Sequence, residues 1–276
     1  MPLFRRKKEV AQVPRTLFAE GPLAQVRNVV AIASAKGGVG KSTLSVNLAA
    51  RLAAQGAAVG LLDADIYGPS IPLMTGVSDE PVLSEDDRLI PVKAHGINLM
   101  SIGFIAGREA PVIWRGPLLA RALQQFLNQV EWGALDYLLV DLPPGTGDVP
   151  LTLSQTIALS GAVIVTTPQS VALEDVERGM AMFDKVEVDV LGVVENMSYY
   201  LCPNCDKRHE VFGRGGGRAA ADRQGVPFLG EVPLIEAIRA GGDHGHPAAL
   251  DAQYEPLFTP LCTGLVGGLR DLAPDD

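Results

Sequence analysis

The chain has 276 residues, of which 47% are hydrophobic and 20% are charged, and its net charge is −9. An acidic balance of this size argues against a general nucleic-acid-binding protein, which normally presents a basic face. No run approaches the roughly 18 consecutive apolar residues of a membrane-spanning helix, and no secretory signal precedes the first apolar run. We therefore expect a cytoplasmic protein that binds neither nucleic acid nor membrane.

The first 26 residues are predicted to form an N-terminal tail, and residues 27–276 are predicted to form a single domain. The tail carries a basic run at residues 5–8 without an accompanying apolar pattern. Such a run is typical of a solvated segment.

From residue 28 onward, short apolar runs alternate with helical patterns. Strands are predicted at residues 28–34, 58–63, 97–103, 136–142, 161–167 and 188–196. Helices are predicted from residue 41 to a stop at Gly56, and at residues 117–130, 171–185 and about 251–270. The strands are nearly continuous in apolar residues, as expected when both faces of a parallel sheet are buried. The alternation predicts an α/β fold, doubly wound, with a mostly parallel sheet and helices on both faces.

The segment ASAKGGVGKST, residues 33–43, follows the first predicted strand and opens the first predicted helix. Its glycines allow backbone N–H groups to point at phosphate oxygens, and the helix N-terminus favours an anion. Lys41 would reach the β- and γ-phosphates, and the Ser42 hydroxyl would coordinate Mg²⁺. The segment therefore predicts a phosphate loop.

The loop departs from the common pattern G-x-x-x-x-G-K-[ST] at its first position. The pattern requires glycine where this chain has Ala35, and the next residue is an additional lysine, Lys36. A glycine-rich turn with solvent-facing lysines is the alternative interpretation. The agreement of strand, loop, Lys-Ser pair and amphipathic helix favours the phosphate loop.

Three aspartates stand at the ends of predicted strands. Asp63 and Asp65 follow the second strand, and Asp141 lies near the end of the strand at residues 136–142. Any one of them could cap the loop that follows. Three carboxylates beside a phosphate loop are what magnesium binding and the positioning of a water require.

Cys202 and Cys205 form a CxxC pair with no further cysteine nearby. Tetrahedral sulfur sites usually have four ligands, so one chain supplies half of such a site. The pair indicates a metal or redox site in a reducing compartment. Cys262 lies in an apolar helical pattern and is expected to be a buried core residue.

The loop with its early lysine resembles the deviant phosphate loop, K-G-G-x-G-K-[ST], of the ATPase group that includes MinD, ParA and nitrogenase iron protein. Further stretches resemble one branch of that group, the Mrp/ApbC-type iron–sulfur cluster carrier ATPases. These stretches are DADIYGPSIPLMTG, WRGPLLARALQQFL, WGALDYLLVDLPPGTGDVPLTLSQ, VENMSYYLCPNC, VFGRGGGRAAA and VPLIEAIRAGGDHGHP. The resemblance covers the chain from about residue 26 to residue 247.

The resemblance implies a homodimer with ATP at its interface, in which Lys36 reaches the partner's nucleotide. It implies that Asp65 positions the attacking water and that Asp63 and Asp141 lie in or near the water shell of Mg²⁺. It places Asn196 against the adenine. The nucleotide contacts that it implies within the loop are Gly37, Gly38, Val39, Gly40, Lys41, Ser42 and Thr43. Among these, Ser42 also binds Mg²⁺ and Lys41 also assists catalysis.

Cys202 and Cys205 match the cluster ligands of the resembled family. A two-fold dimer brings two such pairs together and supplies four thiolates, so the resemblance implies a bridging [4Fe–4S] cluster. ATP hydrolysis is then expected to gate transfer of the cluster from donor proteins to apo iron–sulfur proteins.

Two other functions stay open at this point. Four thiolates also suit a structural zinc ion, which would make the chain a zinc-stapled, dimeric regulatory ATPase. A positioning ATPase like MinD or ParA would need a basic amphipathic helix or a basic surface. The acidic C-terminus, RDLAPDD, and the CxxC pair disfavour that last alternative.

Overall fold

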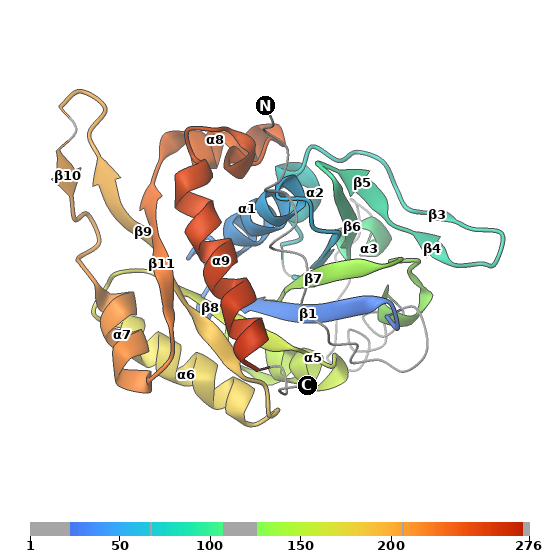
Figure 1. Ribbon diagram of the computed structural model, residues 1–276, viewed down its shortest axis with the longest axis horizontal. Helices are drawn as coiled ribbons and strands as arrows, with labels where there is room; N and C mark the ends of the chain where they lie inside the picture. Colours follow the sequence, from blue (N-terminus) through green and yellow to red (C-terminus); the bar gives the residue numbers. More distant parts are fainter. Residues whose placement is uncertain (1–22, 67, 107–125, 206, 273–276) are drawn as a thin grey trace, which may run out of the picture.

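The computed structural model of the chain describes residues 23–66, 68–106, 126–205 and 207–272 (Figure 1). Its central sheet is built from β1 (Val26–Ala33), β2 (Val59–Asp63), β5 (Val92–Ala94), β6 (Ile97–Ser101), β7 (Leu135–Asp141), β8 (Gly161–Thr166), β9 (Val190–Leu201), β10 (Arg208–His209) and β11 (Phe228–Leu234). A separate pair is formed by β3 (Val82–Leu83) and β4 (Leu89–Ile90).

The strand order in the central sheet is β10-β9-β8-β1-β7-β2-β6-β5, and β11 lies along β9. Neighbouring strands run parallel except for the edge strands β5 and β10, which are antiparallel to β6 and β9. The predicted mostly parallel sheet is confirmed. All six predicted strands are present, the last of them extended to Leu201.

The helices are α1 (Lys41–Ala54), α2 (Ile71–Met74), α3 (Gly103–Ala106), α5 (Asp148–Thr156), α6 (Ala172–Asp184), α7 (Gly216–Gln224), α8 (Glu236–His244) and α9 (Glu255–Asp271), with a 3₁₀ turn at Ala248–Leu250. The predicted helices at 41–55, 171–185 and 251–270 correspond to α1, α6 and α9. No helix in the described residues is long and apolar enough to cross a membrane.

Helices cover both faces of the sheet, as predicted (Figure 1). On β1, Val30 and Ile32 belong to the core that also contains α1 and α9. Their neighbours Val29 and Ala31 belong to the second core, beneath α6 and α7. The strand therefore buries successive side chains on opposite faces, which explains its continuous apolar sequence.

Two predictions fall partly outside the described residues. Of the expected helix at residues 117–130, residues 117–125 lie outside them, and residues 126–129 are helical. Of the expected tail, residues 1–22 lie outside them, and β1 begins at Val26, one residue before the predicted domain boundary. That boundary stays a prediction.

The register of the parallel strands determines where the site lies. Asp141 of β7 pairs with Ile32 of β1 on one side and with Asp63 of β2 on the other. Asp141 and Asp63 therefore stand at the same edge of the sheet as the loop that follows β1. This is the carboxyl edge, where ligands bind in open α/β sheets.

Candidate functional site

A pocket of about 190 Å³ opens at the predicted phosphate loop, between β1 and the N-terminus of α1. Its lining includes all seven predicted contacts in the loop: Gly37, Gly38, Val39, Gly40, Lys41, Ser42 and Thr43. Asp65, from the loop after β2, lines the same pocket. The structure thus brings together the loop and one of the predicted carboxylates around one cavity.

Two glycines of the loop adopt a left-handed backbone. Gly38 and Gly40 each have φ of 79°, a conformation that residues with a Cβ atom rarely adopt. At Gly40 there is also no room, because a Cβ there would lie 2.3 Å from Asn196 Nδ2. At Gly38 nothing lies within 4 Å of the corresponding position.

This contrast provides a matched test of the loop. Gly40→Ala is expected to weaken nucleotide binding at least about tenfold, because it combines backbone strain of roughly 1–2 kcal/mol with a collision against Asn196. Gly38→Ala has the same strain without the collision and is expected to have the smaller effect. Titration of a fluorescent ATP analogue measures both variants. Equal affinities of the two variants would contradict the assigned packing of Asn196 on the loop.

Lys41 is buried in an ionic network at the start of α1. Its ammonium lies 2.8 Å from Asp141 Oδ2, and its side chain is 5% exposed. Ser42 Oγ donates to the same carboxylate oxygen at 2.6 Å, and Ser45 Oγ donates to Oδ1 at 2.6 Å. Asp141 is fully buried, so these donors compensate its charge.

Ser45 is a site residue that the sequence interpretation missed. It lies one helical turn after Lys41, and its hydroxyl bonds both Asp141 and the Lys41 carbonyl oxygen. Ser45 could have been found from its spacing of four residues from Lys41, because this spacing places both side chains on the same side of α1.

Asp63 is fully buried and holds the segment that follows β2. Its Oδ1 accepts the Asp65 backbone N–H at 3.2 Å. Its Oδ2 accepts the Ser101 hydroxyl at 2.9 Å and the Ile71 backbone N–H at 3.3 Å. Burial, with the charge of Asp141 as a second cause, raises the pKa of Asp63 from 3.8 to about 7. Ser101 is another partner that the sequence interpretation missed.

The raised pKa of Asp63 predicts a pH-dependent stability. Between about pH 4 and 7 the folded protein keeps a proton on Asp63 that the unfolded chain has lost, so the free energy of unfolding falls as pH rises. One such proton gives a slope of at most about 1.4 kcal/mol per pH unit. We expect urea unfolding of the nucleotide-free protein to show this slope. Asp63→Asn is expected to remove the part of the slope that comes from Asp63. An unchanged slope in Asp63→Asn would contradict the raised pKa.

The remaining predicted nucleotide-site residues also lie close to the loop. Asp65 Oδ2 is 3.7 Å from the Lys41 ammonium. Asn196, on β9, donates from Nδ2 to the Val39 carbonyl oxygen at 2.8 Å. Asp65 thus lines the pocket and Asn196 contacts its loop, while their roles toward water and adenine stay predictions.

Lys36 is held within its own chain. Its ammonium lies 2.8 Å from Asp175 Oδ2, on α6. The Lys36 side chain is 36% exposed, whereas that of Asp175 is only 10% exposed. This partner could not be predicted from local sequence patterns, because Asp175 lies more than 130 residues further along the chain. The predicted role of Lys36 in a dimer is not tested by this contact.

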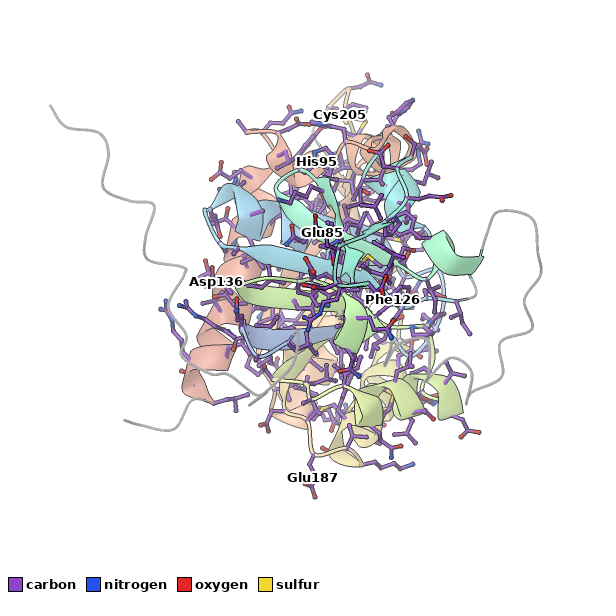
Figure 2. The ribbon with its side chains drawn as sticks, turned by 90° about the vertical axis from the view of Figure 1, so that its right-hand side faces the viewer. Glu85, His95, Phe126, Asp136, Glu187 and Cys205 are labelled. Atoms are coloured by element: carbon purple, nitrogen blue, oxygen red, sulfur yellow. The ribbon has the colours of Figure 1, made fainter. Side chains whose placement is uncertain are left out.

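The two cysteines occupy the turn between β9 and β10, in a hairpin that projects from the edge of the sheet (Figure 1). Figure 2 shows Cys205 at the end of the molecule opposite Glu187. The turn is closed by backbone bonds from Cys202 N–H to the Lys207 carbonyl at 3.0 Å and from Cys205 N–H to the Cys202 carbonyl at 3.4 Å.

The cysteines differ in their surroundings. Cys202 is half-buried and Cys205 is exposed, whereas Cys262 is fully buried in α9, as expected. Within the described residues, no group of three or more His, Cys, Asp or Glu side chains is arranged to hold a metal ion. Burial raises the pKa of the Cys262 thiol to about 12, which disfavours its thiolate.

A phosphate loop between a buried strand and a helix, with carboxylates at the neighbouring strand ends, defines a P-loop nucleotide-binding protein. Residues 25–262 match the family model described as NUBPL iron-transfer P-loop NTPase, in the ParA group. The chain therefore belongs to the NUBPL-type family of iron-transfer P-loop NTPases.

Similar proteins of known name support this family assignment. An iron-sulfur cluster carrier protein of Synechocystis sp. is 53% identical over 247 residues, which cover 87% of this chain and 70% of the relative. A solved nucleotide-binding protein from Archaeoglobus fulgidus, in complex with ADP, is 40% identical with a TM-score of 0.77, covering 86% of this chain and 94% of that one.

The cell division ATPase MinD from Pyrococcus furiosus is a more distant structural relative. It is 22% identical with a TM-score of 0.64, and the match covers 89% of this chain and 99% of MinD. This similarity establishes a shared fold alone, so the alternative of a positioning ATPase has only the fold in its favour.

Proposed function

We propose that this chain is an ATP-hydrolysing carrier that receives an iron–sulfur cluster from donor proteins and delivers it to apo iron–sulfur proteins. One observation carries the proposal: strand β9 connects the two sites. Asn196 on β9 donates a hydrogen bond to the phosphate loop, and Cys202 follows only six positions later, directly after the end of the same strand. A thiolate pair is thus joined to a nucleotide pocket by one continuous element. The family of cluster carriers to which the chain belongs supports the same conclusion.

The nucleotide reaction that we propose is hydrolysis of ATP to ADP and phosphate. Lys41 would exchange part of its contact with Asp141 for the β- and γ-phosphates. Asp65, 3.7 Å from the Lys41 ammonium, would accept a hydrogen bond from the attacking water and orient it toward the γ-phosphate.

The residues around Asp141 fit a magnesium ion, because they offer only oxygen ligands, which hard cations prefer. Ser42 would bind the ion directly, and Asp63 and Asp141 would bind waters around it. The ion would neutralise charge on the phosphates. In the nucleotide-free protein the buried Lys41 ammonium compensates Asp141.

The cargo requires a second copy of the chain. Two thiolates on one hairpin supply half of the four ligands of a [4Fe–4S] cluster, so we propose that the cluster bridges a homodimer. In that dimer Lys36 would leave Asp175 and reach the partner's nucleotide. Thiolate ligands need a reducing environment, for which we propose the cytoplasm.

Anaerobic reconstitution of the full chain with iron and sulfide tests the proposal. We expect about four irons and four sulfides per dimer, with an iron–sulfur absorption spectrum. The loaded protein should pass its cluster to an apo-ferredoxin at a rate that ATP alters. One zinc and no sulfide per dimer would instead support the zinc-stapled regulatory ATPase.

A further inference from the structure

Strand β9 contains an irregularity between the nucleotide pocket and the cysteines. Met197 has φ of 54°, a left-handed conformation that is uncommon for residues other than glycine. Three further described residues share this property, Asp87, His95 and Glu187, and all three lie in turns. Met197 is the member of this group that lies within a strand.

The pairing of β9 with β11 is shifted at the same place. Val232 of β11 pairs with Asn196, and Leu234 pairs with Tyr200. Two steps along β11 thus correspond to four along β9. We refer to this register shift as the bulge. Irregularities of the β-bulge kind bend a strand and change the direction in which its side chains and its continuation point.

The bulge brings two consecutive side chains against the phosphate loop. Asn196 Nδ2 donates to the Val39 carbonyl oxygen at 2.8 Å. A Cβ atom at Gly40 would lie 2.3 Å from Asn196 Nδ2 and 3.5 Å from Met197 Cε. In a regular strand, neighbouring side chains point to opposite faces. The left-handed Met197 therefore allows both residues to contact the loop that holds the phosphates.

Beyond the bulge, β9 is anchored to its neighbours and leads directly to the cysteines. The buried Ser198 hydroxyl donates to the Val232 carbonyl oxygen at 3.3 Å. Tyr200 pairs with Leu234 on one side and with His209 of β10 on the other. Met197 therefore lies on β9 between the phosphate loop and the hairpin that carries Cys202 and Cys205.

We propose that Met197 is a positioning residue that couples occupancy of the phosphate loop by a nucleoside triphosphate to the direction of the cysteine hairpin. A triphosphate that enters the loop displaces Val39 and Gly40, and both press on the bulge. The bulge then changes the exposure of Cys202 and Cys205. Its relevance to cargo release rests on the proposed function, but the coupling itself is measurable without a cluster.

The test compares three substitutions at this position. Met197→Val places two substituents on Cβ and disfavours the left-handed backbone, and Met197→Thr does the same with a different side chain. Met197→Asn is the matched control, because asparagine tolerates this conformation while also lacking the methionine side chain. Two β-branched variants keep the test decisive if one of them folds poorly.

The measurement is the alkylation rate of Cys202 and Cys205 in the reduced, metal-free full chain, resolved by peptide mass spectrometry. Rates are compared without nucleotide and with a saturating non-hydrolysable ATP analogue and Mg²⁺. Site-to-site couplings are commonly 5- to 150-fold, so we expect at least about a fivefold change in the wild type and in Met197→Asn. The β-branched variants are expected to bind the analogue and to show less than about a twofold change, since the conformation needed for coupling is disfavoured.

Two results would overturn the proposal. The first is a wild-type protein whose Cys202 and Cys205 alkylation rates do not change when the analogue binds. The second is a folded, analogue-binding β-branched variant with the full wild-type response. Failure of the proposed function is a separate outcome, because a chain that carries no cluster on reconstitution can still show the nucleotide-dependent thiol response.

Discussion

Replacement of Lys41 by alanine is expected to abolish ATP hydrolysis and to lower the free energy of unfolding by about 3–5 kcal/mol, the usual effect of removing one partner from a buried ion pair. Hydrolysis would be lost because Lys41 lines the pocket and is the ammonium that we propose for the β- and γ-phosphates. Stability is lost because the fully buried Asp141 keeps, among the described residues, the Ser42 and Ser45 hydroxyls as its side-chain partners and has no cation beside it.

Lys41→Arg separates these two effects. It keeps a positive charge beside Asp141, but its planar guanidinium replaces the compact ammonium of lysine. We expect near-normal urea unfolding together with a large loss of phosphate release in a coupled assay. Wild-type turnover in purified Lys41→Ala, free of contaminating ATPases, would disprove the assignment of this pocket.

Replacement of Cys205 by alanine is expected to abolish stable cluster loading while leaving nucleotide affinity within about twofold of the wild type. In the proposed dimer, the two remaining thiolates cannot hold a four-iron cluster against solvent. The pocket is unaffected because Cys205 is exposed on the β9–β10 turn and does not line it.

Cys262→Ala is the matched control for this prediction. It removes a thiol that is fully buried in α9, so we expect reduced stability with normal iron and sulfide content. Iron, sulfide and zinc are quantified after anaerobic reconstitution of each variant. A full cluster in Cys205→Ala, or its loss in Cys262→Ala, would place the cargo elsewhere on the chain.

The sheet could be predicted from sequence because most of its strands are buried on both faces. Continuous apolar runs such as that of β8 leave little ambiguity. Strand β11 was not predicted, because it contains Gly230 and Pro233 and is largely half-buried. Helix α8 was missed for a related reason, since Gly241 and Gly242 weaken its helical pattern.

The part of the nucleotide pocket that is formed by one local segment could be predicted from the sequence. The loop from Gly37 to Thr43 carries its own signature, and strand-end aspartates follow from the parallel sheet. The partners Ser101 and Asp175 come from elements whose positions are determined by tertiary packing, whereas Ser45 could have been found from its spacing to Lys41 on α1. The left-handed backbone of Met197 could not be predicted from the sequence either, because nothing in a methionine side chain favours that conformation.

The part of β9 beyond its bulge is long enough for a small backbone rotation to move the cysteine turn over a larger distance. Cys202 lies five positions past Met197, which is about 16 Å of extended chain. A rotation of about 10° at the bulge, which would carry the paired β10 and Leu234 with it, would therefore move the cysteines by about 3 Å. In a two-fold pair both cysteine turns move, so the separation changes by up to about 6 Å, against a metal–sulfur bond of about 2.3 Å. A backbone adjustment at one residue per chain is thus large enough to release the cluster that we propose two chains share.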